Sequence, residues 1–160
     1  MPTRHRLLDR AFTMLEVMVV ITIIAILAAV AVPRFSGLTD DARSAAAVSA
    51  VGGARSSIAT FRTRRVISGG DPFPTLDELT TPGEVITGSL PSNPYSGLST
   101  VRAVSESDAE SRRVGSETTY GWCYFVDNES EPPRAVIYLN SSEQTRVENA
   151  DGSFKGANEL

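Results

Sequence analysis

The chain has 160 residues, which leaves room for one membrane-spanning helix and one small domain. Its net charge of −4 is unevenly distributed, because residues 69–160 hold six basic and fifteen acidic side chains. So acidic a C-terminal part excludes nucleic acid as its expected partner, since binding to nucleic acid depends on basic groups that neutralise phosphates.

The first predicted element is a membrane-spanning helix over residues 12–33. From Phe12 to Val32 the chain has 21 residues, and only Glu16 among them is charged. At about 1.5 Å per residue, this run matches the roughly 30 Å hydrocarbon core of a bilayer. The preceding residues hold three arginines against one aspartate, which predicts a cytoplasmic N-terminus and an extracytoplasmic C-terminal part.

Residues 1–33 carry a resemblance to a known family. A basic leader over residues 1–11, then Phe-Thr-x-Leu-Glu, then an apolar helix interrupted by Pro33, resembles the class III signal of type IV pilins and type II secretion pseudopilins. The resemblance implies that a membrane prepilin peptidase cuts between Ala11 and Phe12 and that the new amino terminus of Phe12 is methylated. The family usually has glycine before the cut, but Ala11 is small enough that we expect cleavage.

The same resemblance implies that Phe12, Glu16 and Pro33 serve in assembly. An acid inside an apolar span costs roughly 2.5–3.5 kcal/mol at its centre and less near its end, so Glu16 is expected to have a partner. Cleavage frees the Phe12 amine, which is largely protonated at neutral pH. Phe12 and Glu16 are one helical turn apart, so an intrachain pair is open. The family implies instead that Glu16 pairs with the Phe12 amine of the next subunit.

The resemblance also implies the surroundings of the protein. Its expected partners are further copies of itself, other pilin-like subunits, the prepilin peptidase, a membrane assembly platform and membrane lipid. It is expected to cross the bacterial inner membrane once, with its head outside the cytoplasm, and then to enter an extracytoplasmic filament. The loose matches Leu-Pro-Ser-Asn-Pro-Tyr and Gly-Trp-Cys-Tyr are similar to major pseudopilins.

Two other interpretations of the N-terminal segment stay open. Ala29-Val30-Ala31 fits the A-x-A site of a removed secretory signal peptide, although such peptides have a shorter apolar core and no acid. An ordinary signal anchor, in which Glu16 is merely tolerated near the membrane interface, is the second alternative.

Residues 34–68 are predicted to continue the helix as an amphipathic stem. Pro33 should kink the helix rather than end it, because the helical pattern resumes beyond it. Apolar or small side chains recur in steps of three and four and predict one buried stripe: Phe35, Leu38, Ala42, Ala45, Val48, Val51, Ile58 and Phe61. At Gly52-Gly53, we expect either a bend or a closely packed neighbour.

Residues 69–160 are predicted to form an extracytoplasmic head of loops and a small β-sheet. Thr75-Leu76-Asp77-Glu78 has the form of a capping box and predicts one short helical turn. Three runs rich in Val, Ile, Tyr and Phe predict strands, at residues 98–104, 118–126 and 134–139. Residues 105–116 are polar and predict an exposed loop, and the chain beyond Asn140 either adds a strand or frays. The expected fold class is α+β and pilin-like, with the long helix packed against a small antiparallel sheet.

Side chains in the predicted sheet suggest a core and one candidate metal site. Trp122, Tyr124 and Val126 alternate on one strand face and predict a core against the helix, with an aromatic ligand site as the alternative. Cys123, the only cysteine, is expected to be a packed side chain. An acidic turn follows, and its oxygen donors suit calcium, which major pseudopilins can hold in this part of the head: Asp127, Asn128, Glu129 and Glu131. A solvated hairpin tip is the alternative.

The sequence carries no signature of an enzyme. It has no glycine-rich phosphate loop and no cluster of Cys and His, and its only histidine, His5, lies in the leader that cleavage removes. We therefore expect no required cofactor and no catalysis. The predicted function is a structural subunit of a type II secretion pseudopilus or a type IV pilus-like filament. The alternative is a monomeric, membrane-anchored binding module with an acidic head.

Overall fold

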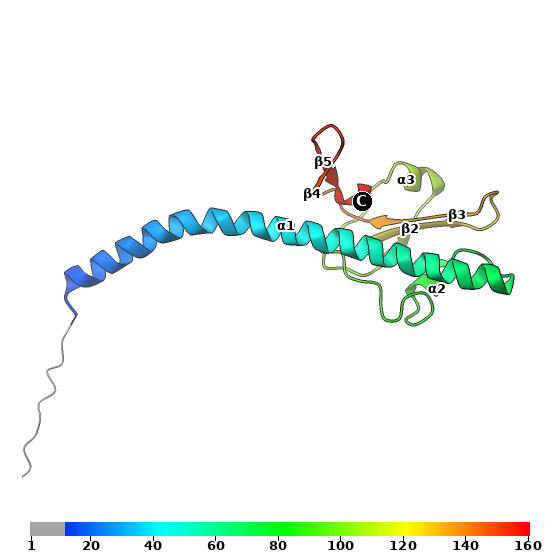
Figure 1. Ribbon diagram of the computed structural model, residues 1–160, viewed down its shortest axis with the longest axis horizontal. Coiled ribbons are helices and arrows are strands. Elements are labelled where there is room, and N and C mark those ends of the chain that lie inside the picture. The colour runs from blue at the N-terminus through cyan, green and yellow to red at the C-terminus, as the bar shows by residue number, and fades with distance from the viewer. Residues whose placement is uncertain (1–11) are drawn as a thin grey trace, which may run out of the picture. The chain divides into compact units, whose positions relative to one another are not determined.

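The computed structural model describes residues 12–160 and divides into two compact units at the bond between Leu38 and Thr39 (Figure 1). One helix, α1 (Met14–Ser68), crosses this boundary. The leader and Ala11 lie outside the described residues, so the predicted cut is described on one side only. The fold class is confirmed: a long N-terminal helix packs in the second unit against small, mostly antiparallel β-sheets.

The first unit is the apolar part of α1. By length and composition α1 can cross a membrane, and none of its apolar window is buried within the chain. The hydroxyl of Thr22 donates to the Met18 carbonyl oxygen at 2.7 Å, so this polar group is satisfied within the apolar helix. Pro33 lies inside the helix and does not end it, as the sequence predicts. The predicted kink at Pro33 stays a prediction.

The second part of α1 forms one wall of the head's core. Its buried positions recur in steps of three and four: Ser44, Ala47, Val51, Ala54, Ile58 and Phe61. The predicted stripe is right from Val51 onward but wrong before it, since Phe35, Leu38, Ala42, Ala45 and Val48 are exposed. Because alanines lie on more than one face of this part of α1, the sequence is compatible with two choices of buried face. Ser44 sets the real phase, because its Oγ accepts the backbone N–H of Arg146 at 2.9 Å.

Gly52 and Gly53 neither break α1 nor meet a neighbour. Both are exposed, and a methyl group added to either would have no atom within 4 Å. The expected close packing against these glycines is therefore wrong within this chain.

Two short helices lie within the loop segments of the head. Helix α2 (Leu76–Thr80) begins with the predicted capping box, in which Thr75 Oγ1 accepts from Glu78 N and the Glu78 carboxylate accepts from Thr75 N. Helix α3 (Glu106–Glu110) occupies the segment predicted to be a loop, so that prediction is wrong there. Its five residues are too few to display a helical period in the sequence.

The main sheet has three strands in the order β1-β2-β3. Strands β2 (Trp122–Asp127) and β3 (Arg134–Leu139) pair antiparallel, with Trp122 opposite Leu139. Strand β1 (Val101–Ala103) pairs with β2 in parallel, which differs from the all-antiparallel sheet that the sequence predicts. The intervening connection, which contains α3, is long enough to return the chain for parallel pairing.

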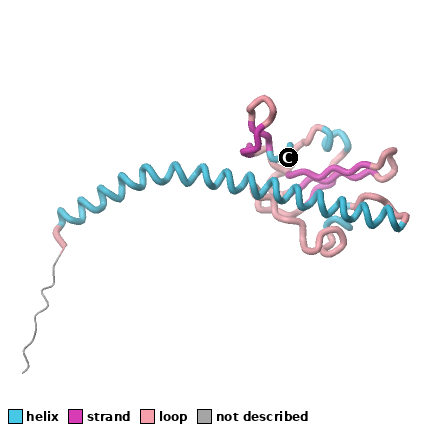
Figure 2. The backbone as a smooth tube through the Cα atoms, in the orientation of Figure 1, coloured by secondary structure: helices cyan, strands magenta, loops and turns pink. Residues whose placement is uncertain are grey.

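The end of the chain is ordered rather than frayed. Strands β4 (Gln144–Glu148) and β5 (Phe154–Gly156) form a second antiparallel pair, and a 3-10 turn, η1 (Ala157–Glu159), follows. Figure 2 shows these strands in magenta and how much of the head is loop. The open prediction for the residues beyond Asn140 is thereby resolved in favour of added strands.

The aromatic core prediction is confirmed. Trp122 and Tyr124 are buried against α1 and β3, and Val126 packs half-buried beside them. The polar ends of both rings are satisfied, since Trp122 Nε1 donates to the Pro91 oxygen at 2.8 Å and Tyr124 Oη donates to the Pro74 oxygen at 2.7 Å. These two bonds tie the segments before and after α2 to the sheet.

Buried asparagines hold the remaining loops. Asn140 Oδ1 accepts from Gly115 N at 2.8 Å, and its Nδ2 donates to the Tyr120 oxygen at 2.8 Å. Asn93 Nδ2 donates to the Gly121 oxygen at 2.9 Å while its Oδ1 accepts from Tyr95 N. Each side-chain amide therefore satisfies backbone N–H and C=O groups of loops that have no strand or helix partner.

Cys123 is predicted to be unreactive in the folded protein. The side chain is fully buried, and burial raises the pKa of its thiol. Because the thiolate is the reactive form, we expect no labelling by a thiol reagent at pH 8 in the native full-length chain. Complete labelling is expected in 8 M urea. Rapid labelling without denaturant would show that β2 opens readily.

Candidate processing and assembly site

The first turn of α1 is built by a cap. Glu16 N donates to Thr13 Oγ1 at 3.2 Å, and Val17 N donates to the Thr13 carbonyl oxygen at 3.2 Å. Thr13-Met-Leu-Glu16 is thus a Thr-x-x-Glu pattern at a helix start. The sequence interpretation missed Thr13, although this spacing was readable in it.

Glu16 lies in the first turn of α1, where the helix dipole favours a negative charge. Its side chain is exposed, and within residues 12–160 no hydrogen bond or ion pair to its carboxylate is formed. The helix therefore accounts for a carboxylate at this position but supplies no cation for it.

Phe12 precedes the helix, which begins at Met14. The i,i+4 geometry of an α-helix therefore does not connect Phe12 with Glu16 in the uncut chain, and the intrachain pair considered from the sequence stays a prediction. Phe12 is 75% exposed. The ring and the carboxylate both lie exposed at the N-terminal end of the apolar helix.

Pro33 is not brought together with these residues. It lies 17 positions beyond Glu16 on the same helix, about 25 Å along its axis. Each large apolar side chain between them is at least 46% exposed. So large an apolar surface is unstable in water and requires a cover of lipid or of other helices. The site is therefore a long apolar rod with an acid at its beginning.

A family model described as the prokaryotic N-terminal methylation motif matches residues 6–32. The chain carries this motif. It is the prepilin-type cleavage and methylation signal of type IV pilins and pseudopilins, and it confirms the resemblance stated from the sequence. Comparisons with curated proteins and with solved structures gave no match.

The methylation motif supports several general statements about the chain. It is the signal of pilin-like substrates of a prepilin peptidase, and it generally implies interactions with that peptidase and with pilin-type subunits. Together with the exposed apolar helix it supports anchoring in a membrane. The proteins that share the methylation motif are structural rather than enzymatic.

The proposed calcium turn lies at the tip of the β2–β3 hairpin. Asp127 Oδ1 accepts from Glu129 N and Ser130 N, both at 3.0 Å, and Asn128 Oδ1 accepts from Phe73 N at 3.0 Å. Among residues 12–160 no group of three His, Cys, Asp or Glu side chains is placed to hold a metal ion. One oxygen each of Asp127 and Asn128 thus binds backbone N–H groups and holds the turn. Calcium binding by Asp127, Asn128, Glu129 and Glu131 stays a prediction.

Proposed function

We propose that this chain is a structural subunit of a type II secretion pseudopilus or a type IV pilus-like filament. It is cut between Ala11 and Phe12, methylated at Phe12, and assembled through residues 12–33. The observation that carries the proposal is the methylation motif on an apolar segment, residues 12–32. Its large apolar side chains are exposed, and its one acid, Glu16, has no cation among the described residues.

The physical basis of assembly is the exchange of lipid contacts for contacts with other copies. Before assembly the apolar helix is covered by the hydrocarbon of the inner membrane, with the acidic head outside the cytoplasm. In a filament, the same surface packs against the helices of neighbouring subunits. Glu16 then meets the methylated amine of an adjacent Phe12, because a charge in apolar surroundings is stable only with a partner.

The alternative function is a membrane-anchored binding module that remains a monomer. It needs the same apolar helix but neither cleavage nor methylation. Processing therefore separates the two functions before assembly is examined.

The test is the intact mass of the full-length chain after co-expression with a prepilin peptidase and extraction from the membrane. We expect loss of residues 1–11 and gain of one methyl group. An Ala11→Trp variant is the control, because its bulky side chain should block the cut while the membrane helix stays unchanged. A full-length wild-type mass would favour the anchor, and a cut after Ala31 would show a secretory signal peptide; either result overturns the proposal.

A further inference from the structure

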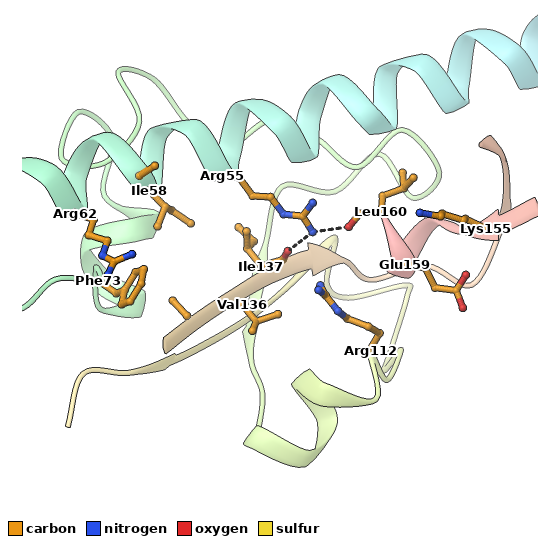
Figure 3. A pocket seen from close by; sticks show the side chains of 12 residues that line it. Arg55, Ile58, Arg62, Phe73, Arg112, Val136, Ile137, Lys155, Glu159 and Leu160 are labelled. Carbon is orange, nitrogen blue, oxygen red and sulfur yellow. Dashed lines mark hydrogen bonds between the residues drawn. The ribbon is translucent and has the colours of Figure 1, made fainter. Parts of the chain in front are cut away.

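A basic groove of about 540 Å³ lies in the head between α1, strand β3 and the C-terminal segment (Figure 3). We call it the edge groove. Its apolar lining includes Ile58, Phe73, Val136 and Ile137. Four cationic side chains also line it: Arg55, Arg62, Arg112 and Lys155. So concentrated a positive charge is unexpected in a head whose residues 69–160 are strongly acidic.

Among residues 12–160, none of the four cations of the edge groove forms an ion pair with an Asp or Glu side chain. Five other arginines form ion pairs with carboxylates: Arg65, Arg102, Arg113, Arg134 and Arg146. In the groove, Arg55 donates instead to the backbone oxygens of Ile137 and Leu160. Arg62 lies over the Phe73 ring at 4.9 Å. The groove therefore holds four cationic side chains against one acidic side chain, Glu159.

Arg112 is the least satisfied of these cations. Its guanidinium lies over the Tyr138 ring at 5.3 Å, and its Nη1 is buried without a hydrogen-bond partner. Burial and the like charge of Arg112 together lower the pKa of Arg55. The acid of the lining, Glu159, accepts from Gly156 N through its Oε2 at 2.9 Å and forms no ion pair with the four cations. An anion entering the groove would relieve this repulsion.

Arg112 also occupies a backbone position that suits glycine. Its φ of 52° is left-handed, and it follows the end of α3, where Arg112 N donates to the Ala109 oxygen and Arg113 N to the Asp108 oxygen. This is the Schellman arrangement, in which glycine is the usual residue at the left-handed position. A side chain there costs roughly 1 kcal/mol, so the arginine is present at the expense of stability.

The groove runs along an unpaired sheet edge. In the order β1-β2-β3, one edge of β3 has no strand beside it. The Ile137 oxygen points out of that edge to Arg55, and Figure 3 shows Arg55 and Arg112 on opposite sides of β3. An extended segment lying along this edge would direct alternate side chains to the two sides of β3, and each side carries an arginine.

We propose that the edge groove binds an extended acidic peptide segment of a partner protein, laid alongside β3. Arg55 occupies the Ile137 oxygen and η1 packs against β3, so backbone groups of the segment pair with the part of the β3 edge that these leave free. Its apolar side chains contact Phe73 and Val136, and its carboxylates pair with Arg62 and Arg112. The charge of the groove selects the partner, because a basic or neutral strand would leave the buried guanidinium unpaired. This site goes beyond the filament function and does not require assembly.

The test measures binding of a fluorescein-labelled octapeptide, two repeats of Glu-Glu-Val-Val, to the full-length chain in detergent micelles, by fluorescence anisotropy. When extended, this peptide presents carboxylates and apolar side chains on both sides. We expect binding that weakens with salt, although the chain itself is net negative. Arg112→Gly and Arg62→Gln should each weaken binding about tenfold, since each removes a charged partner. Arg43→Gln is the matched control: it removes an exposed arginine of α1 outside the groove and should change nothing.

The melting temperature of each variant distinguishes loss of the binding site from loss of the folded head. Arg112→Gly relieves the left-handed arginine and gives up the contact with Tyr138, so the melting temperature should stay within a few degrees of wild type. Three results would each overturn the proposal. These are equal binding of the Glu-Glu-Val-Val peptide and a Gln-Gln-Val-Val peptide, an equal loss in Arg43→Gln, or saturation by inorganic phosphate with no peptide bound. A chain that binds the peptide but does not polymerise would overturn the filament function alone.

Discussion

Replacing Glu16 with glutamine is expected to abolish filament assembly while leaving membrane insertion intact. Glutamine is nearly the same size and keeps an oxygen at the third helical position, but it has no charge to meet an amine. Removing one partner of an ion pair in apolar surroundings leaves the other uncompensated, which costs about 3–5 kcal/mol per contact. Filament yield after shearing from cells that express the assembly machinery measures the effect, and the amount of membrane-extracted subunit measures insertion.

Thr13→Ala is the matched control for this experiment. It removes the cap that Glu16 N uses, at a cost of about 1 kcal/mol to the first turn, but leaves the carboxylate in place. If Glu16 served only the helix start, the two variants would behave alike. We expect Thr13→Ala to assemble and Glu16→Gln not to assemble. A normal filament yield from Glu16→Gln would show that assembly does not depend on the charge of Glu16.

Gly121→Ala is expected to destabilise the head by about 3 kcal/mol or more. A methyl group at Gly121 would lie 2.0 Å from the Leu98 carbonyl oxygen and 2.7 Å from the Leu98 carbonyl carbon. Both are backbone atoms, so no side-chain rotation relieves the clash. Moving this backbone also disturbs the bond from Asn93 to the Gly121 oxygen and the start of β2.

Urea denaturation of the full-length chain in detergent measures this loss through the fluorescence of Trp122, the only tryptophan, which is fully buried. Gly88→Ala is the control, because a methyl group at Gly88 would meet nothing within 4 Å and its φ is not left-handed. We expect the midpoint of Gly88→Ala to match wild type. Equal midpoints for Gly121→Ala and wild type would mean that Leu98 moves away at little cost.

Local features of the sequence were enough to predict the helix and the core strands. A run of apolar residues and its continuation in steps of three and four predicted α1 through Pro33. Alternating aromatic residues predicted the buried face of β2, and Thr75 with Glu78 predicted α2. The methylation motif was also readable, since it depends on residues that are adjacent in the chain.

The sequence by itself thus determined that this protein has a pilin-type signal on an apolar helix followed by a small α+β head. Only the tertiary structure decided which face of the stem is buried, that β1 runs parallel to β2, and that four scattered cations meet at the edge of β3. The physical reason is the range of the interactions. Hydrophobic period and capping act over one or two turns of chain. Burial of Ser44, by contrast, depends on Arg146, which is 102 residues away in the chain.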